Sequence, residues 1–251
     1  MAQSLEEWIA SDVRVLDDRS PAWLAQHHFF RDPYRPRFVD QSYFFSPADG
    51  IILYQKIVKP DSQLVDFKSE RYTLQDAMRD SSFHSESLVI GIFMTFFDVH
   101  TNRIPYSGYL AYRELEPIGT YNRPMVAMEN TILEDLRIDL NKAAYLRQNQ
   151  RMVNRIYAPR LRQSYYVLQI ADYDVDCILP YRLNQNTPFR QGDRFSQIRH
   201  GSQVELVIPL TYRYGLEVLQ PDGCHVQAGL DPLVRIDVQH FPGIDLRKGE
   251  V

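Results

Sequence analysis

The sequence predicts an α+β fold that is mainly antiparallel β, built like a barrel or sandwich, with helices near the N-terminus and in the middle of the chain. Residues 165–238 alternate apolar and polar side chains in short runs separated by turn residues, which is typical of antiparallel strands. Apolar residues recur with helical spacing in residues 4–17, 73–78 and 129–147. Helices that are segregated from a mostly antiparallel sheet define the α+β class.

Composition indicates one folded unit and argues against some classes of binding partner. The 251 residues are 44% hydrophobic and 24% charged, which is sufficient for one packed core. The net charge of −4 argues against a nucleic-acid-binding surface, because such surfaces are normally basic. Cys177 and Cys224 match neither a redox pair nor a zinc site, so we expect reduced core thiols. Since the N-terminus lacks a secretory pattern, we expect a cytoplasmic protein.

The first 42 residues are predicted to form a helix and an arm. Residues 4–7 fit a capping box, and the apolar residues that follow share one helical face. Three prolines restrict the backbone of residues 20–42, so an ordered arm is expected to run over the surface and cover a cleft. His27 and His28 have no partners at metal-ligand spacing and are interpreted as loop residues.

Strands and helices are predicted to alternate from residue 43 to residue 147. The predicted elements are strands at 43–46 and 51–58, a helix at 73–78, a strand at 88–97 and a helix at 129–147. The turn at 47–50 is expected to join the first two strands into a hairpin. The apolar strand at 88–97 is about half the ~20 residues needed to span a bilayer as a helix. The arginine-rich stretch at 147–162 is interpreted as solvated or anion-facing.

Most of the remaining chain is predicted to be β-structure. The predicted strands are 165–171, 176–179, 203–210, 216–219, 225–228 and 233–238. Gly201 and Ser202 stand immediately before the third of these strands. Gly-Ser is a common turn pair, and a plain turn is one interpretation. The other is self-cleavage, because the pair places a serine hydroxyl directly after a glycine carbonyl.

Three segments in a fixed order decide between these interpretations. They are FSPADG at 45–50, FDVHTNRIPYSG at 97–108, and GDRF followed by IRHGS within 192–202. Together they resemble the turn, histidine segment and cleavage site of the phosphatidylserine decarboxylase family, in its short, pyruvoyl-dependent form. The similarity covers residues 43–236. The chain is therefore predicted to consist of the N-terminal helix and arm at 1–42 and, from the resemblance, a decarboxylase-like catalytic domain at 43–251.

The resemblance implies that the chain is a zymogen that processes itself. Ser202 would attack the carbonyl of Gly201, which divides the chain into a β chain of 1–201 and an α chain of 202–251. Ser202 would thereby become a pyruvoyl group, whose ketone takes up the substrate amine and accepts electrons as carbon dioxide leaves. The two fragments are expected to remain associated.

The resemblance also assigns roles to individual side chains. Besides Ser202, the catalytic candidates are His100, which would protonate the product carbon, and Asp49, which would assist self-cleavage. Arg103 and His200 are candidates for substrate binding, and no metal is expected. Taken without the motifs, Asp49 is a hairpin-turn residue and His100 a core or capping histidine.

Arg103 departs from the pattern of the longer family members. Those members carry a second histidine at this position, which belongs to their self-cleavage triad. Arginine cannot accept a proton at neutral pH. The sequence therefore leaves two alternatives for the base that activates Ser202: His100 serves both steps, or another residue such as His200 assists.

The substrate and the activity each leave an alternative open. The predicted reaction is decarboxylation of phosphatidylserine to phosphatidylethanolamine, or of a related soluble amino acid or peptide-derived acid. Expected partners are that substrate, a membrane surface contacted peripherally, and further copies of the chain, with no nucleic acid. The alternative class is a non-processing relative that acts as a binding module. This alternative is based on the Val-Gln-Ala-Gly run at 226–229 of the chain, which is similar to the hammerhead strands of lipoyl-type carrier domains.

Overall fold

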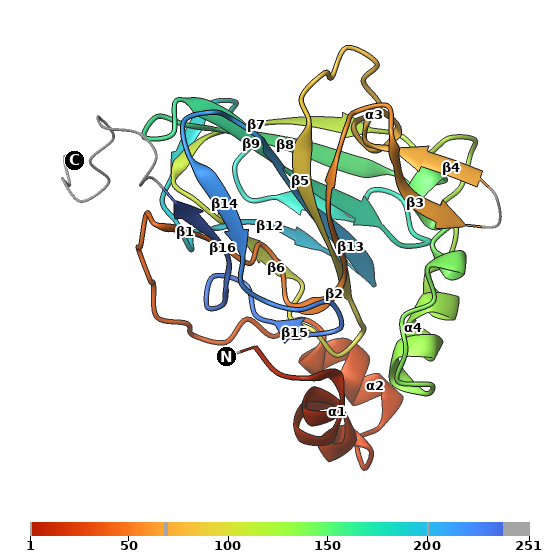
Figure 1. Ribbon diagram of the computed structural model, residues 1–251. Coiled ribbons are helices and arrows are strands. Elements are labelled where there is room, and N and C mark those ends of the chain that lie inside the picture. Colours follow the sequence, from red (N-terminus) through yellow and green to blue (C-terminus); the bar gives the residue numbers. More distant parts are fainter. Residues whose placement is uncertain (1, 68–69, 200, 238–251) are drawn as a thin grey trace.

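An antiparallel sheet of eight strands forms the centre of the molecule (Figure 1). The computed structural model describes residues 2–67, 70–199 and 201–237. In spatial order the strands are β11 (Thr187–Phe189), β7 (Gly108–Leu115), β8 (Arg151–Ala158), β9 (Gln163–Ala171), β13 (Ser202–Pro209), β5 (Ser87–Met94), β2 (Gly50–Val58) and β15 (His225–Val226). Strand β13 begins at Ser202 and is paired along its length with β5 and with β9. The proposed scissile bond therefore lies at the end of a strand that is held from both sides.

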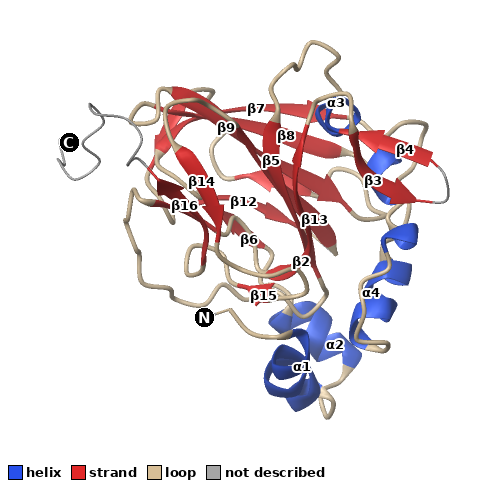
Figure 2. Ribbon diagram, viewed as in Figure 1, coloured by secondary structure: helices blue, strands red, loops and turns tan. Residues whose placement is uncertain are grey.

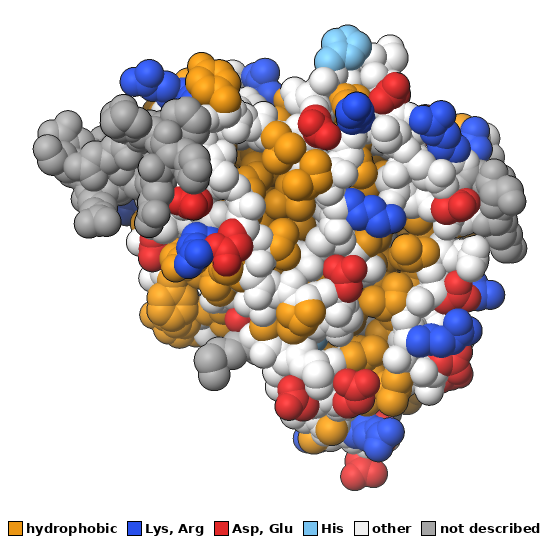
Figure 3. Space-filling model, viewed as in Figure 1, with side chains coloured by type: hydrophobic (Ala, Val, Ile, Leu, Met, Phe, Trp, Pro, Cys, Tyr) orange, Lys and Arg blue, Asp and Glu red, His pale blue; other side chains and the backbone are white. Residues whose placement is uncertain are grey.

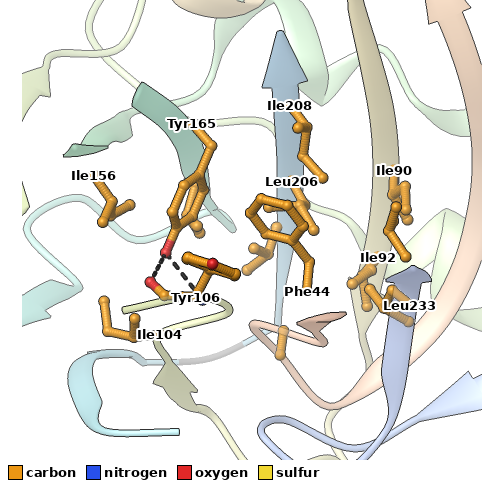
Figure 4. Packing of buried hydrophobic residues seen from close by; sticks show 14 of the residues in the cluster. Phe44, Ile90, Ile92, Ile104, Tyr106, Ile156, Tyr165, Leu206, Ile208 and Leu233 are labelled. Atoms are coloured by element: carbon orange, nitrogen blue, oxygen red, sulfur yellow. Dashed lines mark hydrogen bonds between the residues drawn. The ribbon is translucent and has the colours of Figure 1, made fainter. Parts of the chain in front are cut away.

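Smaller sheets pack around this centre. They are β1 (Tyr43–Phe45) with β16 (Pro232–Asp237) and β14 (Gly215–Val218); β10 (Ile178–Pro180) with β12 (Arg194–Ile198) and β6 (Thr101–Arg103); and β3 (Gln63–Phe67) with β4 (Glu70–Thr73). One hydrophobic core joins the two three-stranded sheets to one face of the central sheet. In this core Phe44 of β1 and Leu233 of β16 lie near Leu206 and Ile90 of the central strands (Figure 4).

The helices are short and lie at the edge of the strands (Figure 2). They are α1 (Leu5–Trp8), continued by turns at Ile9–Val13 and Arg14–Leu16; α2 (Pro21–Trp23), continued by Leu24–His28; α3 (Leu74–Met78); α4 (Val126–Leu133); a turn at Leu140–Lys142; and α5 (Tyr145–Gln148). Their apolar side chains form a second core against the other face of the central sheet. Within the described ranges, no helix is long and apolar enough to cross a membrane.

Several predictions from the sequence are confirmed. The class is α+β and mainly antiparallel, with helices at the N-terminus and in the middle. Ser4 caps the N-terminal helix through a complete capping box, and the predicted helix at 73–78 forms at Leu74–Met78. The apolar run at 88–97 forms β5, which is buried throughout, although it ends at Met94. Cys177 and Cys224 are free and buried.

The predicted hairpin at 43–58 is wrong. Strand β1 pairs with β16, whereas β2 pairs with β5 and β15, so the turn at 47–50 carries the chain from one sheet to another. Asp49 in this turn hydrogen-bonds to distant residues, and Gly50 has a φ of 148°. A Cβ at Gly50 would lie 2.1 Å from the carbonyl oxygen of Phe93, so glycine is required by this close approach.

The predicted helix at 129–147 is interrupted. Helix α4 ends at Leu133, and Leu136 takes a left-handed φ of 52°, a conformation that breaks a right-handed helix. Asp139 then caps a separate turn at 140–142. The helical period of the apolar residues continues across this break, which is why the pattern did not reveal it.

The interpretation of the arginine-rich stretch at 147–162 as solvated or anion-facing is wrong for Arg151 and for the strand that carries it, whereas Arg147, Arg155 and Arg162 are exposed. Residues 151–158 form β8, in the middle of the central sheet. Arg151 is fully buried and donates hydrogen bonds to the hydroxyl of Tyr72 and the carbonyl oxygen of Ala77, each at 3.0 Å. Burial of a charged side chain is tolerated here because its donors are satisfied internally.

Candidate active site

Ser202 is fully buried at the start of β13, between Ala171 of β9 and Met94 of β5. Its hydroxyl lies 3.2 Å from the sulfur of Met94. A Cβ on the preceding Gly201 would lie 3.1 Å from Oδ2 of Asp172, which is a tight contact, so a larger residue would require the Asp172 side chain to shift. His200, the second candidate for substrate binding, lies outside the described residues.

Asp49 occupies a buried ion pair in the turn between β1 and β2. Both of its carboxylate oxygens accept hydrogen bonds from Arg35, each at 2.6 Å, and one oxygen also accepts from the backbone N–H of Ala228 at 2.8 Å. Arg35 donates in addition to the carbonyl oxygen of Ala228 at 3.0 Å. Two-pronged pairs of this kind fix both partners in orientation. The predicted arm thus reaches into the body of the protein through Arg35.

His100 is fully buried, and its two ring nitrogens differ in their surroundings. Its Nδ1 lies 3.0 Å from the carbonyl oxygen of Asp98, and because a carbonyl can only accept, Nδ1 carries the hydrogen. The ring packs against Phe29 with centroids 4.1 Å apart. Its Nε2 has no hydrogen-bond partner among the residues described. A buried nitrogen with a free lone pair is available to take up a proton.

The protonation state of His100 follows from its surroundings. Burial lowers the pKa of this imidazole to about 4, and only in part is this opposed by the negative charges of Asp98 and Asp49. His100 is therefore neutral near pH 7. It can accept a proton in that state, and it can donate one only after having accepted it.

His100 is tied to the segment that leads to the proposed cleavage site. Its carbonyl oxygen accepts a hydrogen bond of 3.1 Å from the N–H of Ile198, the last residue of β12. The sulfur of Met94 lies close both to the Ser202 hydroxyl and, at 3.7 Å, to the side-chain amide of Asn102. The fold thus gathers the segments around Asp49, His100 and Ser202 at one end of strands β2, β5 and β13.

Arg103 lines a cavity together with Arg35, the partner of Asp49. It is buried, and its guanidinium donates to the carbonyl oxygen of Gly192 at 3.0 Å and to Asp32 at 3.4 Å. Burial and the neighbouring charge of Arg35 lower its pKa. Arginine remains charged at neutral pH even so, and its bonding groups are donors only. Arg103 therefore fits the binding of an anion and not the role of a base.

Comparison with known proteins decides the family. A family model described as phosphatidylserine decarboxylase matches residues 25–232. The chain belongs to the phosphatidylserine decarboxylase family.

Three relatives illustrate the similarity within this family of carboxy-lyases. A protein of Methanothermobacter thermautotrophicus, whose name assigns it provisionally as an archaetidylserine decarboxylase proenzyme, is 30% identical over 209 residues, which are 83% of this chain and 79% of that protein. The phosphatidylserine decarboxylase proenzyme of Ehrlichia chaffeensis is 30% identical over 183 residues, with 73% and 65% covered. That of Ralstonia pickettii is 28% identical over 209 residues, with 83% and 77% covered.

One feature of this family member that the sequence did not reveal is a buried pair of Asp98 and His225. Nε2 of His225 lies 2.7 Å from Oδ1 of Asp98, and the ring stacks on Trp8 at 4.5 Å. Burial acts to raise the pKa of Asp98, but His225 and the hydrogen bonds from Thr95 lower it overall. Asp98 belongs to the recognised histidine segment, whereas His225 comes from the far end of the chain. No local pattern could have joined them.

Two further carboxylates near the cleavage site were also missed. Asp172 follows β9, lies close to Gly201, and accepts a hydrogen bond of 2.6 Å from the N–H of Met125. Glu129 on α4 accepts one of 2.6 Å from the N–H of Phe96, and burial raises its pKa to about 7. In the described ranges, no three His, Cys, Asp or Glu side chains are grouped so that they could hold a metal ion.

The buried imidazole predicts a pH-dependent stability that can be measured. The pKa of His100 is about 4 in the folded state and ordinarily 6.5, so between these pH values the unfolded chain binds a proton that the folded protein does not. The free energy of unfolding should therefore fall as the pH drops from 6.5 to 4. The loss should reach about 3 kcal/mol, from ~1.4 kcal/mol for each pKa unit.

The test compares His100→Gln with the parent, both carrying Ser202→Ala so that each sample is a single chain. Glu129 acts in the opposite direction, because its raised pKa stabilises the folded state as the pH falls from 7 to 4.5, but it is present in both proteins. In denaturant titrations, the free energy of unfolding of the variant should rise relative to that of the parent as the pH drops. A difference in unfolding free energy that stays constant with pH would refute the assignment.

Proposed function

We propose that this chain is a self-processing, pyruvoyl-dependent decarboxylase that converts phosphatidylserine to phosphatidylethanolamine. The observation that carries the proposal is the placement of Gly201–Ser202 at the buried end of β13, beside segments that contribute His100 and Asp49. The names of the relatives support phosphatidylserine as the substrate. Two of them name phosphatidylserine and one names archaetidylserine, so all three name a lipid that carries serine. Since such a lipid resides in a bilayer, the proposal includes peripheral contact with a membrane.

Self-cleavage would begin with attack of the Ser202 hydroxyl on the carbonyl carbon of Gly201. The peptide C–N bond breaks, the nitrogen takes up a proton, and an ester joins the two segments. Loss of a proton from the α-carbon of residue 202 expels the carboxylate of Gly201, which becomes the new C-terminus. Water then replaces the nitrogen as ammonia and leaves a ketone. Each step moves protons, so a base must lie nearby.

His100 is the best candidate for that base. It is neutral at pH 7, its Nδ1 hydrogen is engaged by Asp98, and its Nε2 lone pair is free of partners within the described part of the chain. This supports the alternative in which one histidine serves both steps, since Arg103 cannot accept a proton. A proton taken up at Nε2 would then be available to the product carbon.

Asp49 would act through charge and position. Its carboxylate is already engaged by Arg35 and by the N–H of Ala228, and its negative charge raises the pKa of His100 against the effect of burial. A carboxylate that stabilises the protonated imidazole assists each step in which His100 takes up a proton.

The surroundings of Ser202 fit a pyruvoyl group. The position is fully buried, the neighbouring sulfur of Met94 is only weakly polar, and a small residue precedes it. Once formed, that group would supply an electron-accepting ketone for the decarboxylation. Strand β13 pairs with β5 and β9, and β16 pairs with β1, so the two fragments would remain joined by the sheets after cleavage.

An assay with purified protein tests the proposed function. Phosphatidylserine in mixed detergent micelles should yield phosphatidylethanolamine and carbon dioxide in equal amounts, and free serine should yield far less. Products are measured by lipid chromatography and by release of labelled carbon dioxide. A protein that decarboxylates free serine as readily as the lipid would contradict the lipid assignment. A protein active on neither would contradict the enzyme assignment.

A further inference from the structure

Six arginines line one cavity of about 650 Å³. They come from the N-terminal arm, from β6, from the segment between β10 and β12, and from the first residue of β12. They are Arg35, Arg37, Arg103, Arg182, Arg190 and Arg194. A cavity of this size lies within the range of ~300–1,000 Å³ that is usual for small-ligand sites.

The carboxylates around the cavity do not balance these charges. Asp49 pairs with Arg35, Asp32 contacts both Arg103 and Arg194, and Asp193 pairs with Arg37. Six guanidinium groups thus face three carboxylates. In the described ranges no carboxylate pairs with Arg182, whose guanidinium lies 4.9 Å from the ring centre of Phe189, or with Arg190.

The excess of positive charge is local to this cavity, and the repulsion between the arginines is unfavourable when no anion is bound. The chain as a whole carries a net charge of −4, and on the face shown in Figure 3 acidic and basic side chains are interspersed. Arg103 is buried, and the like charges of Arg35 and Arg194 lower its pKa together with burial. Converging cations at a partly desolvated position are stabilised by a bound anion.

The cavity also adjoins the proposed reaction centre. Arg35 lines the cavity, and its guanidinium donates hydrogen bonds to both carboxylate oxygens of Asp49. Arg103 lines it too and follows His100 by three residues on the same segment. Arg37 is 59% exposed and Tyr34 is 91% exposed, so the cavity opens to solvent on the side of the arm. A ligand could therefore reach from the surface toward Asp49 and His100.

We propose that this cavity binds the phosphodiester of a phospholipid headgroup. The proposal rests on the proposed function for the link between the headgroup and the reaction. Planar guanidinium groups bind phosphate oxygens in pairs, and several of them around one cavity suit a group whose charge is spread over two oxygens. Arg182 and Arg190, which lack a carboxylate partner in the described part of the chain, are the residues that a phosphodiester would engage most directly.

The test uses the full-length protein and glycerophosphoethanolamine, a soluble phosphodiester with no carboxylate to lose. Calorimetric titration should show saturable binding that weakens as salt is added, whereas ethanolamine should not bind. Replacing two cavity arginines, Arg182→Gln with Arg190→Gln, should weaken binding about tenfold or more, as expected for lost charge-assisted bonds. The matched control is Arg137→Gln with Arg235→Gln, which removes the same charge from exposed sites outside the cavity and should leave binding unchanged.

The outcomes separate this proposal from the proposed function. Binding of the diester that the two cavity substitutions leave intact would overturn the cavity proposal, and so would a site that takes inorganic phosphate but not the diester. If the protein decarboxylates phosphatidylserine and the KM is unchanged in the cavity variant, the cavity proposal fails and the function stands. Arginine-dependent diester binding by a protein that never cuts itself would support the cavity proposal while the function fails.

Discussion

Replacing Ser202 with alanine is expected to leave the chain uncut and without decarboxylase activity. The hydroxyl is the proposed nucleophile and its carbon atoms are the proposed source of the ketone, so no other group can replace it. The fold should survive, because the side chain is fully buried against the sulfur of Met94 and loses only a weak contact. Electrophoresis and mass analysis should find one chain, and the assay should detect no phosphatidylethanolamine.

Ser196→Ala provides the matched control. Ser196 is also a fully buried strand serine, and it donates to the carbonyl oxygen of Leu179 on β10, the neighbouring strand of the same sheet. This variant should be processed and active. Cleavage of Ser202→Ala at the same position, or activity of an uncut chain, would refute the role of Ser202.

Exchange of Asp49 for asparagine should slow self-cleavage by about 10²-fold or more, because general-base catalysis by His100 would lose the charge that stabilises its protonated form. Asparagine keeps the shape and can still accept from the N–H of Ala228, but it removes the negative charge that favours protonation of His100. It also leaves Arg35 without its ionic partner, which should cost about 3–5 kcal/mol of stability for a buried pair. The cleavage rate is measured by electrophoresis of freshly synthesised protein.

A second variant separates chemistry from stability. Asp193→Asn removes a carboxylate from another arginine pair, that with Arg37 at 3.1 Å, on the edge of the same cavity. It should be processed at the rate of the parent. If Asp49→Asn is destabilised but cleaves as fast as the parent, Asp49 is a structural residue and its proposed role in maturation is wrong.

The sequence allowed the class of fold to be predicted because strand alternation and helix capping are local. The capping boxes at Ser4 and Thr73 each involve residues three positions apart. Arg151 marks the limit of this reasoning. Its burial depends on Tyr72 and Ala77, which are distant in the chain. The charged residues of β8 therefore did not indicate a buried strand. The false hairpin at 47–50 has the same origin, because Asp49 bonds to Arg35 and Ala228.

The candidate site was predictable where its chemistry lies in short motifs. Asp49, His100 and Ser202 each stand in such a motif. Their partners could not be predicted, because pairing of Arg35 with Asp49 and of His225 with Asp98 is created by tertiary structure. The sequence also shows that Arg103 cannot serve as the base that longer family members have at this position. That Nε2 of His100 has no hydrogen-bond partner within the described ranges, which supports one of the two alternatives, could be seen only in the fold.

The most direct test of the central claim is the intact mass of the purified protein, measured before and after treatment with a carbonyl-specific hydrazine. Two fragments are predicted, residues 1–201 and residues 202–251. The smaller should be lighter, by one ammonia, than the same peptide with a serine N-terminus, and it alone should gain the mass of the reagent less one water, as a hydrazone forms. A single uncut chain of 251 residues, or a fragment that begins with a free serine amine and does not react, would contradict the account.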